Sequence, residues 1–138
     1  MADPRMDLWQ QMQKYLPLAI ERGFREMKVD EYAGGLSHRV VHDTYTRLYA
    51  GSITPEQAKE RLNFWEDSLA QEVEGTRWEA DAWAKGGDCW LALDIKHIAE
   101  AWFRRAVRVG HCNDGGGTLP ALTALSDMGL DPWKGVTS

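Results

Sequence analysis

Apolar side chains recur three or four residues apart through most of this 138-residue chain. No segment alternates apolar with polar residues in the way that a half-buried strand does. Capping residues and glycines bound the periodic runs and divide the chain into about six helical segments. We therefore predict an all-α fold, a compact bundle of five to six helices formed by a single domain over residues 1–138.

The helices are expected over residues 7–27, 37–49, 54–74, 76–86, 88–109 and 118–128. Ser37 is the expected N-cap of the second helix, after a break over residues 30–35. Thr54, Pro55 and Gln57 give the third the clearest start, a capping box with proline at its first position. The fifth, from Asp88 to Val109, has the widest apolar arc and should be the long central helix.

The composition fits an ordinary globular protein, with 43% hydrophobic and 27% charged residues. The net charge of -5 argues against general binding to nucleic acid, although a local basic stripe is not excluded. No apolar run is long enough to span a membrane, and the N-terminus lacks a signal-peptide core. We expect a cytoplasmic protein in which Cys89 and Cys112 are thiols.

Acidic residues crowd the stretch 56–81, which also carries several of the seven tryptophans. Seven indoles are hard to bury completely in a domain of this size, so some should lie at the surface. Exposed tryptophan beside acidic charge is typical of protein-binding surfaces. The partner-binding residues predicted on this basis are Trp78, Trp83, Glu66, Asp67, Glu72, Glu74 and Glu79.

The chain carries no catalytic or cofactor signature with the required spacing, so the leading hypothesis is a non-enzymatic interaction protein. It would dock its acidic, tryptophan-bearing face on a protein or ribonucleoprotein partner. In general character this fits small inhibitors, immunity proteins or phage host-takeover factors such as anti-CRISPRs, although no family motif is present. A homodimer would also account for surplus tryptophan, since subunit interfaces are rich in aromatic residues.

A basic stripe on the fifth helix supports a second hypothesis. Projection at helical spacing places His97, Arg104 and Arg108 within a narrow arc opposite the apolar face. Such a stripe could bind a phosphate, a nucleic-acid backbone or an acidic partner. The nearby loop with Gly115–Gly117 could present backbone N–H groups to an anion, although it lacks the phosphate-binding spacing.

The histidine pair His38 and His42 supports a third hypothesis, a small metal-dependent hydrolase. Imidazoles four residues apart share one face of a helix and can bind one metal ion. The sequence supplies no identifiable third ligand, and it lacks the glutamate of the helical zinc-protease motif. We therefore assign no metal ligand, no catalytic residue and no cofactor.

Overall fold

The computed structural model describes residues 29–113 and 118–135, and every regular element within these ranges is helical. The predicted all-α bundle is confirmed for this part of the chain. The helix expected over residues 7–27 and the glycines of the 115–117 loop lie outside it. The α-helices are α2, Val29–Ala50; α3, Pro55–Phe64; α4, Glu79–Ala92; α5, Lys96–Asn113; and α6, Thr118–Asp127.

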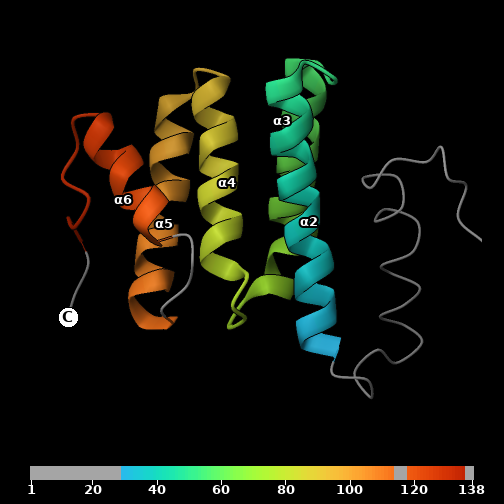
Figure 1. Ribbon diagram of the computed structural model, residues 1–138, viewed down its shortest axis with the longest axis horizontal. Coiled ribbons are helices and arrows are strands. Elements are labelled where there is room, and N and C mark those ends of the chain that lie inside the picture. Colours follow the sequence, from blue (N-terminus) through green and yellow to red (C-terminus); the bar gives the residue numbers. More distant parts are fainter. Residues whose placement is uncertain (1–28, 114–117, 136–138) are drawn as a thin grey trace, which may run out of the picture.

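Helix α4 lies at the centre of the bundle (Figure 1). It packs between α2 and α5, and it also contacts α3 and α6. Helix α6 covers α5 at the end of the bundle away from α2. The prediction of one central helix over 88–109 is wrong, because residues up to Ala92 complete α4 and α5 begins at Lys96.

A tight turn between α4 and α5 replaces the continuous helix that was expected. Asp94 has a φ of 63°, and its N–H donates to the Leu91 carbonyl at 2.9 Å. The N–H of Ile95 donates to the Trp90 carbonyl at 3.0 Å, which completes a helix-ending motif. Aspartate is one of the few residues that adopt this left-handed conformation at low cost. Because apolar residues keep their helical spacing across the turn, the sequence pattern did not reveal it.

Several glycines expected to end helices, or to lie in the break over residues 30–35, instead lie inside helices, where another element comes close. A β-carbon on Gly86 would lie 2.1 Å from the ring of Trp102, and one on Gly110 would lie 1.5 Å from Oγ1 of Thr118. On Gly34 it would lie 2.9 Å from the Glu72 carbonyl oxygen. By contrast, Gly51 and Gly129 have φ values of 73° and 78° and follow the ends of α2 and α6, as predicted.

Ser37 joins α2 to the next helical segment and is not the N-cap that the sequence suggested. It is fully buried inside α2, and its hydroxyl donates to the Leu69 carbonyl at 2.6 Å. The same hydroxyl accepts the indole N–H of Trp65 at 2.8 Å. Trp65 is also completely buried, so this bond fixes two helical segments inside the core.

The capping box at the start of α3 is confirmed. Oγ1 of Thr54 accepts the N–H of Gln57 at 3.1 Å, and Oε1 of Gln57 accepts the N–H of Thr54 at 2.9 Å. The next helix, expected from residue 76, starts without such a box. The carboxylate of Glu79 accepts the N–H of Gly75 at 3.0 Å. Helix α4 begins at Glu79 itself.

Helix α3 continues into a π-helical turn, Trp65–Leu69, and then a 3₁₀ turn, Ala70–Val73. The π turn is closed by the N–H of Ala70, which donates to the Trp65 carbonyl. Such a turn contains one residue more than an α-helical turn. It keeps Trp65 and Leu69 in the core and leaves Glu66, Asp67 and Ser68 exposed.

Four tryptophans form the centre of the core. Trp83 lies edge-on to Trp65 and Trp102, with ring centroids 5.0 and 4.8 Å away, and Trp90 lies edge-on to Trp102 at 6.1 Å. These are favourable aromatic geometries. Trp102 belongs to this core, with 3% of its surface exposed. Within the described ranges, no helix has the length and apolar composition required to span a membrane.

Candidate ligand-binding cavity

The acidic tryptophan face does not form as predicted. Trp83 is only 4% exposed and Glu79 only 6%, so the expectation that they lie at the surface is wrong. Trp83 is enclosed because α4 is the central helix and places this indole against Trp65 and Trp102. Glu79 is turned inward to accept the backbone N–H of Gly75.

The other members of the predicted face are distributed over two sides of the molecule. Trp78 is partly buried, stacked on His38 at 5.3 Å and covered by the guanidinium of Arg77 at 4.4 Å. Glu66 and Glu74 instead lie close to basic side chains of α5. Asp67 is exposed and Glu72 partly so. The predicted residues therefore do not share one continuous surface.

A cavity of about 410 Å³ lies where α3 and its π turn meet α4 and α5. Its apolar lining is formed largely by Trp83, Trp90 and Trp102, together with Ile98 and Ala101. Cavities that bind small molecules have this volume range. Trp83, Trp90 and Trp102 are each only 3–4% exposed, so little of their ring surface reaches the cavity. The sequence did not predict the cavity, because it is created by the α4–α5 turn and the packing that follows from it.

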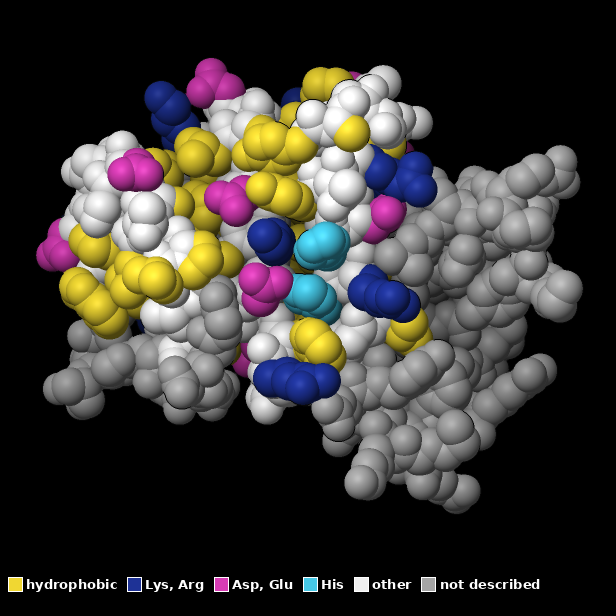
Figure 2. All heavy atoms as spheres, in the orientation of Figure 1, with side chains coloured by type: hydrophobic (Ala, Val, Ile, Leu, Met, Phe, Trp, Pro, Cys, Tyr) yellow, Lys and Arg dark blue, Asp and Glu magenta, His cyan; other side chains and the backbone are white. Residues whose placement is uncertain are grey.

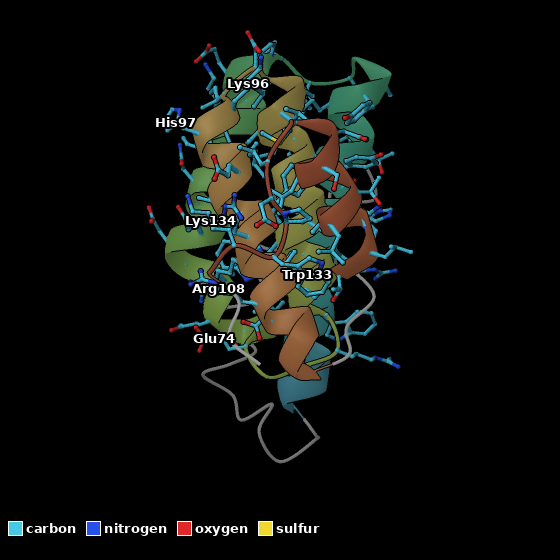
Figure 3. All side chains as sticks on the ribbon, turned by 90° about the vertical axis from the view of Figure 1, so that its left-hand side faces the viewer. Glu74, Lys96, His97, Arg108, Trp133 and Lys134 are labelled. Carbon is cyan, nitrogen blue, oxygen red and sulfur yellow. The ribbon has the colours of Figure 1, made fainter. Side chains whose placement is uncertain are left out.

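Three cationic or potentially cationic side chains line the cavity, namely His97, Arg105 and Arg108 of α5. Figure 3 shows His97 and Arg108 along one side of α5, with Lys96 and Lys134 on the same side. His97 and Arg108 are exposed, and neither forms an ion pair with any described residue. Both belong to the basic stripe expected from the sequence, and both remain available to a ligand.

Arg105, which the sequence placed outside the stripe, is held at the edge of the cavity by two contacts. Its guanidinium lies 4.5 Å from the ring centroid of Trp83, and one of its nitrogens lies 4.0 Å from the Glu74 carboxylate. Contacts of this kind fix a guanidinium in one orientation. The position of Arg105 depends on the α4–α5 packing, so helical projection alone could not identify it.

Arg104 has a different role from the one that the stripe suggested. Its Nε donates to the Glu100 carboxylate at 2.7 Å, and its terminal nitrogen donates to the Asp131 carbonyl at 2.9 Å. This fastens the segment after α6 to α5. Arg104 lines a separate, smaller hollow of about 290 Å³, which also includes Arg108 and Lys134.

Two indole N–H groups in the cavity wall lack hydrogen-bond acceptors. Nε1 of Trp83 and Nε1 of Trp90 are both buried and find no acceptor in the described part of the chain. Edge-on contact with Trp102 does not replace one, because N–H···π interactions are weak. Buried donors are almost always satisfied in folded proteins, so these two indole N–H groups are exceptions within the core that borders the cavity.

Asn63 and Glu66 line the cavity from the side of α3 and its π turn. Burial is the main cause that raises the pKa of Glu66 above its ordinary value, and the neighbouring Asp67 carboxylate raises it further. The positive charge of Arg105 lowers the pKa of Glu66. The cavity thus presents an amide and a carboxylate from one segment and cationic groups from another. π turns occur frequently at functional sites.

The two predicted histidines lie away from this cavity, between α2 and α4. Nε2 of His38 is hydrogen-bonded to a carboxylate oxygen of Asp81, and this bond is the main cause that lowers the pKa of Asp81. His42 lies beside His38, with ring centroids 6.1 Å apart. Figure 2 shows histidine side chains next to acidic and basic ones on this face. The hydrogen bond between His38 and Asp81 connects α2 with α4.

The structure gives no support to a metal site at this histidine pair. Within residues 29–113 and 118–135, no three or more His, Cys, Asp or Glu side chains are grouped so that they could hold a metal ion. Asp81 occupies Nε2 of His38, a nitrogen that a metal ion would require. The side chains of His111 and Cys112 lie outside the described residues.

Comparison with known proteins gives no relative: no family model, curated protein or solved structure matches this chain.

Proposed function

We propose that the protein is a non-enzymatic binding protein that takes a small anionic ligand into the cavity between α3, α4 and α5. The observation that carries this proposal is a cavity of about 410 Å³ lined by three basic side chains, His97, Arg105 and Arg108, in a chain of net charge -5. Arginine recognises carboxylates and phosphates through several directed N–H groups.

The cavity also has the properties that binding requires before the ligand arrives. Arg105 is oriented by Trp83 and Glu74, so less side-chain entropy is lost when it binds. Arg108 has no competing ion pair with a described residue.

This proposal takes the place of docking through an acidic tryptophan face, since Trp83 and Glu79 are buried. The basic stripe of the sequence contributes His97 and Arg108, while Arg104 supports the segment that follows α6.

Anilinonaphthalene sulfonate is a suitable probe because it combines aromatic rings with a fixed negative charge. The probe should bind the full chain with a stoichiometry of one, and energy transfer from the cavity tryptophans should report its binding. Arg108→Ala should weaken binding by about tenfold, the cost of one charge-assisted hydrogen bond. Arg39→Ala, which removes an exposed arginine of α2, should leave binding unchanged.

Two results would contradict the proposal. One is the absence of saturable binding to the folded protein. The other is equal binding by the Arg108→Ala and Arg39→Ala variants, which would show that the probe does not use the cavity cations. A near-ultraviolet circular dichroism spectrum that is unchanged in each variant would show that the tryptophan core is intact.

A further inference from the structure

We infer that the ligand is a small bisphosphate, which places one phosphate group in the cavity and the other in the adjoining hollow of about 290 Å³. The inference rests on the proposed function and adds the ligand's chemical class. It is drawn from the way in which the basic side chains of α5 and its surroundings are divided between these two spaces.

The cavity and the hollow share part of their wall. Ala101 and Arg108 of α5 line both spaces, and both residues are exposed. The side chain of Ala101 is a single methyl group, so only a low ridge separates the two spaces at this point. A ligand that crosses Ala101 can therefore occupy both.

The two spaces hold arginines in equivalent arrangements. In the cavity, Arg105 lies 4.0 Å from the carboxylate of Glu74. In the hollow, Arg104 donates to the carboxylate of Glu100 at 2.7 Å. Because the two arginines are consecutive, they leave the helix in directions roughly 100° apart. Arg108 is three residues from one and four from the other, so it lies next to both and serves both spaces.

Each space also has a basic side chain of its own that forms no ion pair with a described residue. This side chain is His97 in the cavity and Lys134 in the hollow. Figure 3 shows both on the same side of α5 as Arg108. With Arg108 counted in both, each space presents three basic side chains. Such a group suits the three acceptor oxygens and the double charge of a phosphate better than it suits a carboxylate.

Carboxylates limit this basic surface on both sides. Glu66 and Glu74 lie beside the cations of the cavity, and Glu100 lies beside Arg104 in the hollow. They would repel a polyanion that extended beyond the two spaces, and the net charge of -5 acts in the same direction. The surface therefore favours a short ligand with two phosphates over a nucleic-acid strand.

Isothermal titration calorimetry on the full chain tests the inference, with hexanediol bisphosphate and hexyl phosphate as probes. The bisphosphate should bind with a stoichiometry of one and at least about tenfold more tightly than hexyl phosphate, because its second phosphate binds intramolecularly. Lys134→Ala should weaken the bisphosphate by about tenfold. The same variant should bind anilinonaphthalene sulfonate as the parent does, because Lys134 does not line the cavity.

Lys96→Ala is the matched control. Lys96 is an exposed lysine on the same side of α5, and it lines neither the cavity nor the hollow. Its removal changes the net charge by the same amount, so the affinity for the bisphosphate should fall by less than about twofold. Equal losses in the Lys134→Ala and Lys96→Ala variants would overturn the inference, because the effect would then be one of general charge.

Three further results would overturn it. The first is a bisphosphate that binds no more tightly than hexyl phosphate. The second is a stoichiometry of two for the bisphosphate, which would show that the spaces are independent sites. The third is a thymidine oligonucleotide of about ten residues that binds more than about tenfold more tightly than the bisphosphate, which would indicate an extended backbone as the ligand.

The two proposals fail in different ways. If the sulfonate probe binds in a manner that depends on Arg108 but the second phosphate adds no affinity, only the bisphosphate assignment fails. If neither the sulfonate probe nor either phosphate compound binds, the anion-binding function fails as well.

Discussion

The ring of Trp102 occupies the space that a side chain on Gly86 would need: an ideal β-carbon there would lie 2.1 Å from Cζ3 of the indole. Helices α4 and α5 therefore approach as closely as they do because position 86 has no side chain. The neighbouring Gly87 receives Phe103 in the same way, with a β-carbon to ring distance of 2.7 Å. This contact positions both Trp102 and the cations of α5.

Gly86→Ala should consequently destabilise the protein by about 3 kcal/mol or more, because overpacking of this severity requires the helices to separate. Chemical denaturation monitored by circular dichroism measures the change in the free energy of unfolding. The double variant Gly86→Ala with Trp102→Leu should be less destabilised than the sum of the single changes, since a smaller side chain relieves the clash. Additive losses would show that Trp102 is not the obstacle.

Ser37→Ala tests the buried bond between α2 and the π turn. The change removes the donor to the Leu69 carbonyl and one of two acceptors for the Trp65 indole N–H, which also donates to the Ser37 carbonyl at 3.1 Å. We expect a loss of about 1 to 3 kcal/mol in the free energy of unfolding, because buried polar groups lose their partners. Ser68→Ala, at an exposed position in the π turn, should cost less than about 0.5 kcal/mol. Similar losses in both variants would contradict a specific role of the buried bond, because alanine is the better helix former and propensity cannot cause the loss.

The glycines explain how far the fold could be predicted from sequence. Helical periodicity identified an all-α bundle, and Thr54 and Gln57 located the start of α3 correctly. A glycine, however, has the same appearance in sequence whether it ends a helix, as Gly51 does, or receives a ring within one, as Gly86 does. Only the tertiary contact distinguishes these cases, and that is why the helix boundaries were displaced.

The site was predictable to a smaller extent. His97 and Arg108 could be found because both lie on the polar face of one helix. Arg105 could not, because its position is determined by Trp83 on a neighbouring helix. Trp83 is buried in the cluster of four tryptophans. Composition alone had suggested that this residue lies at the surface.

Two carboxylates of α4 should give the protein opposite responses to pH. The hydrogen bond from His38 lowers the pKa of Asp81, so the unfolded chain holds its proton more tightly there. The stabilisation from Asp81 is therefore complete above the unfolded pKa of about 4 and is lost as the pH falls through the lower folded value. Asp81→Asn should be less stable than the parent at about pH 6, with a difference that narrows towards about pH 2.

Asp88 should behave in the reverse sense. Burial raises its pKa, so the folded state binds the proton more tightly and the charged form opposes folding at neutral pH. Asp88→Asn should be more stable than the parent at about pH 7, and this advantage should disappear below about pH 4. Denaturation of both variants across this range provides the measurement. Changes of the same sign in both variants would contradict the assignment.

Cys89 should be unreactive in the folded protein. It is completely buried, and burial, together with the Asp88 charge, raises the pKa of its thiol to about 12. Because the thiolate is the reactive form, a disulfide reagent should modify Cys89 only after unfolding. In a Cys112→Ser background, the labelling rate should increase with denaturant in parallel with the unfolded fraction. Rapid labelling of the native protein would show that the α4 core opens locally.

The extra residue in the turn Trp65–Leu69 should make this part of the surface tolerant of the loss of one residue. Three consecutive exposed residues, Glu66, Asp67 and Ser68, occupy the turn. Because a π turn holds one residue more than an α-helical turn, removing one of them would close an ordinary α-helical turn in which Ala70 keeps its place next to Trp65. The residues that follow would stay in register with the core. Within an ordinary stretch of α-helix, the same deletion would instead rotate the following residues by roughly 100°.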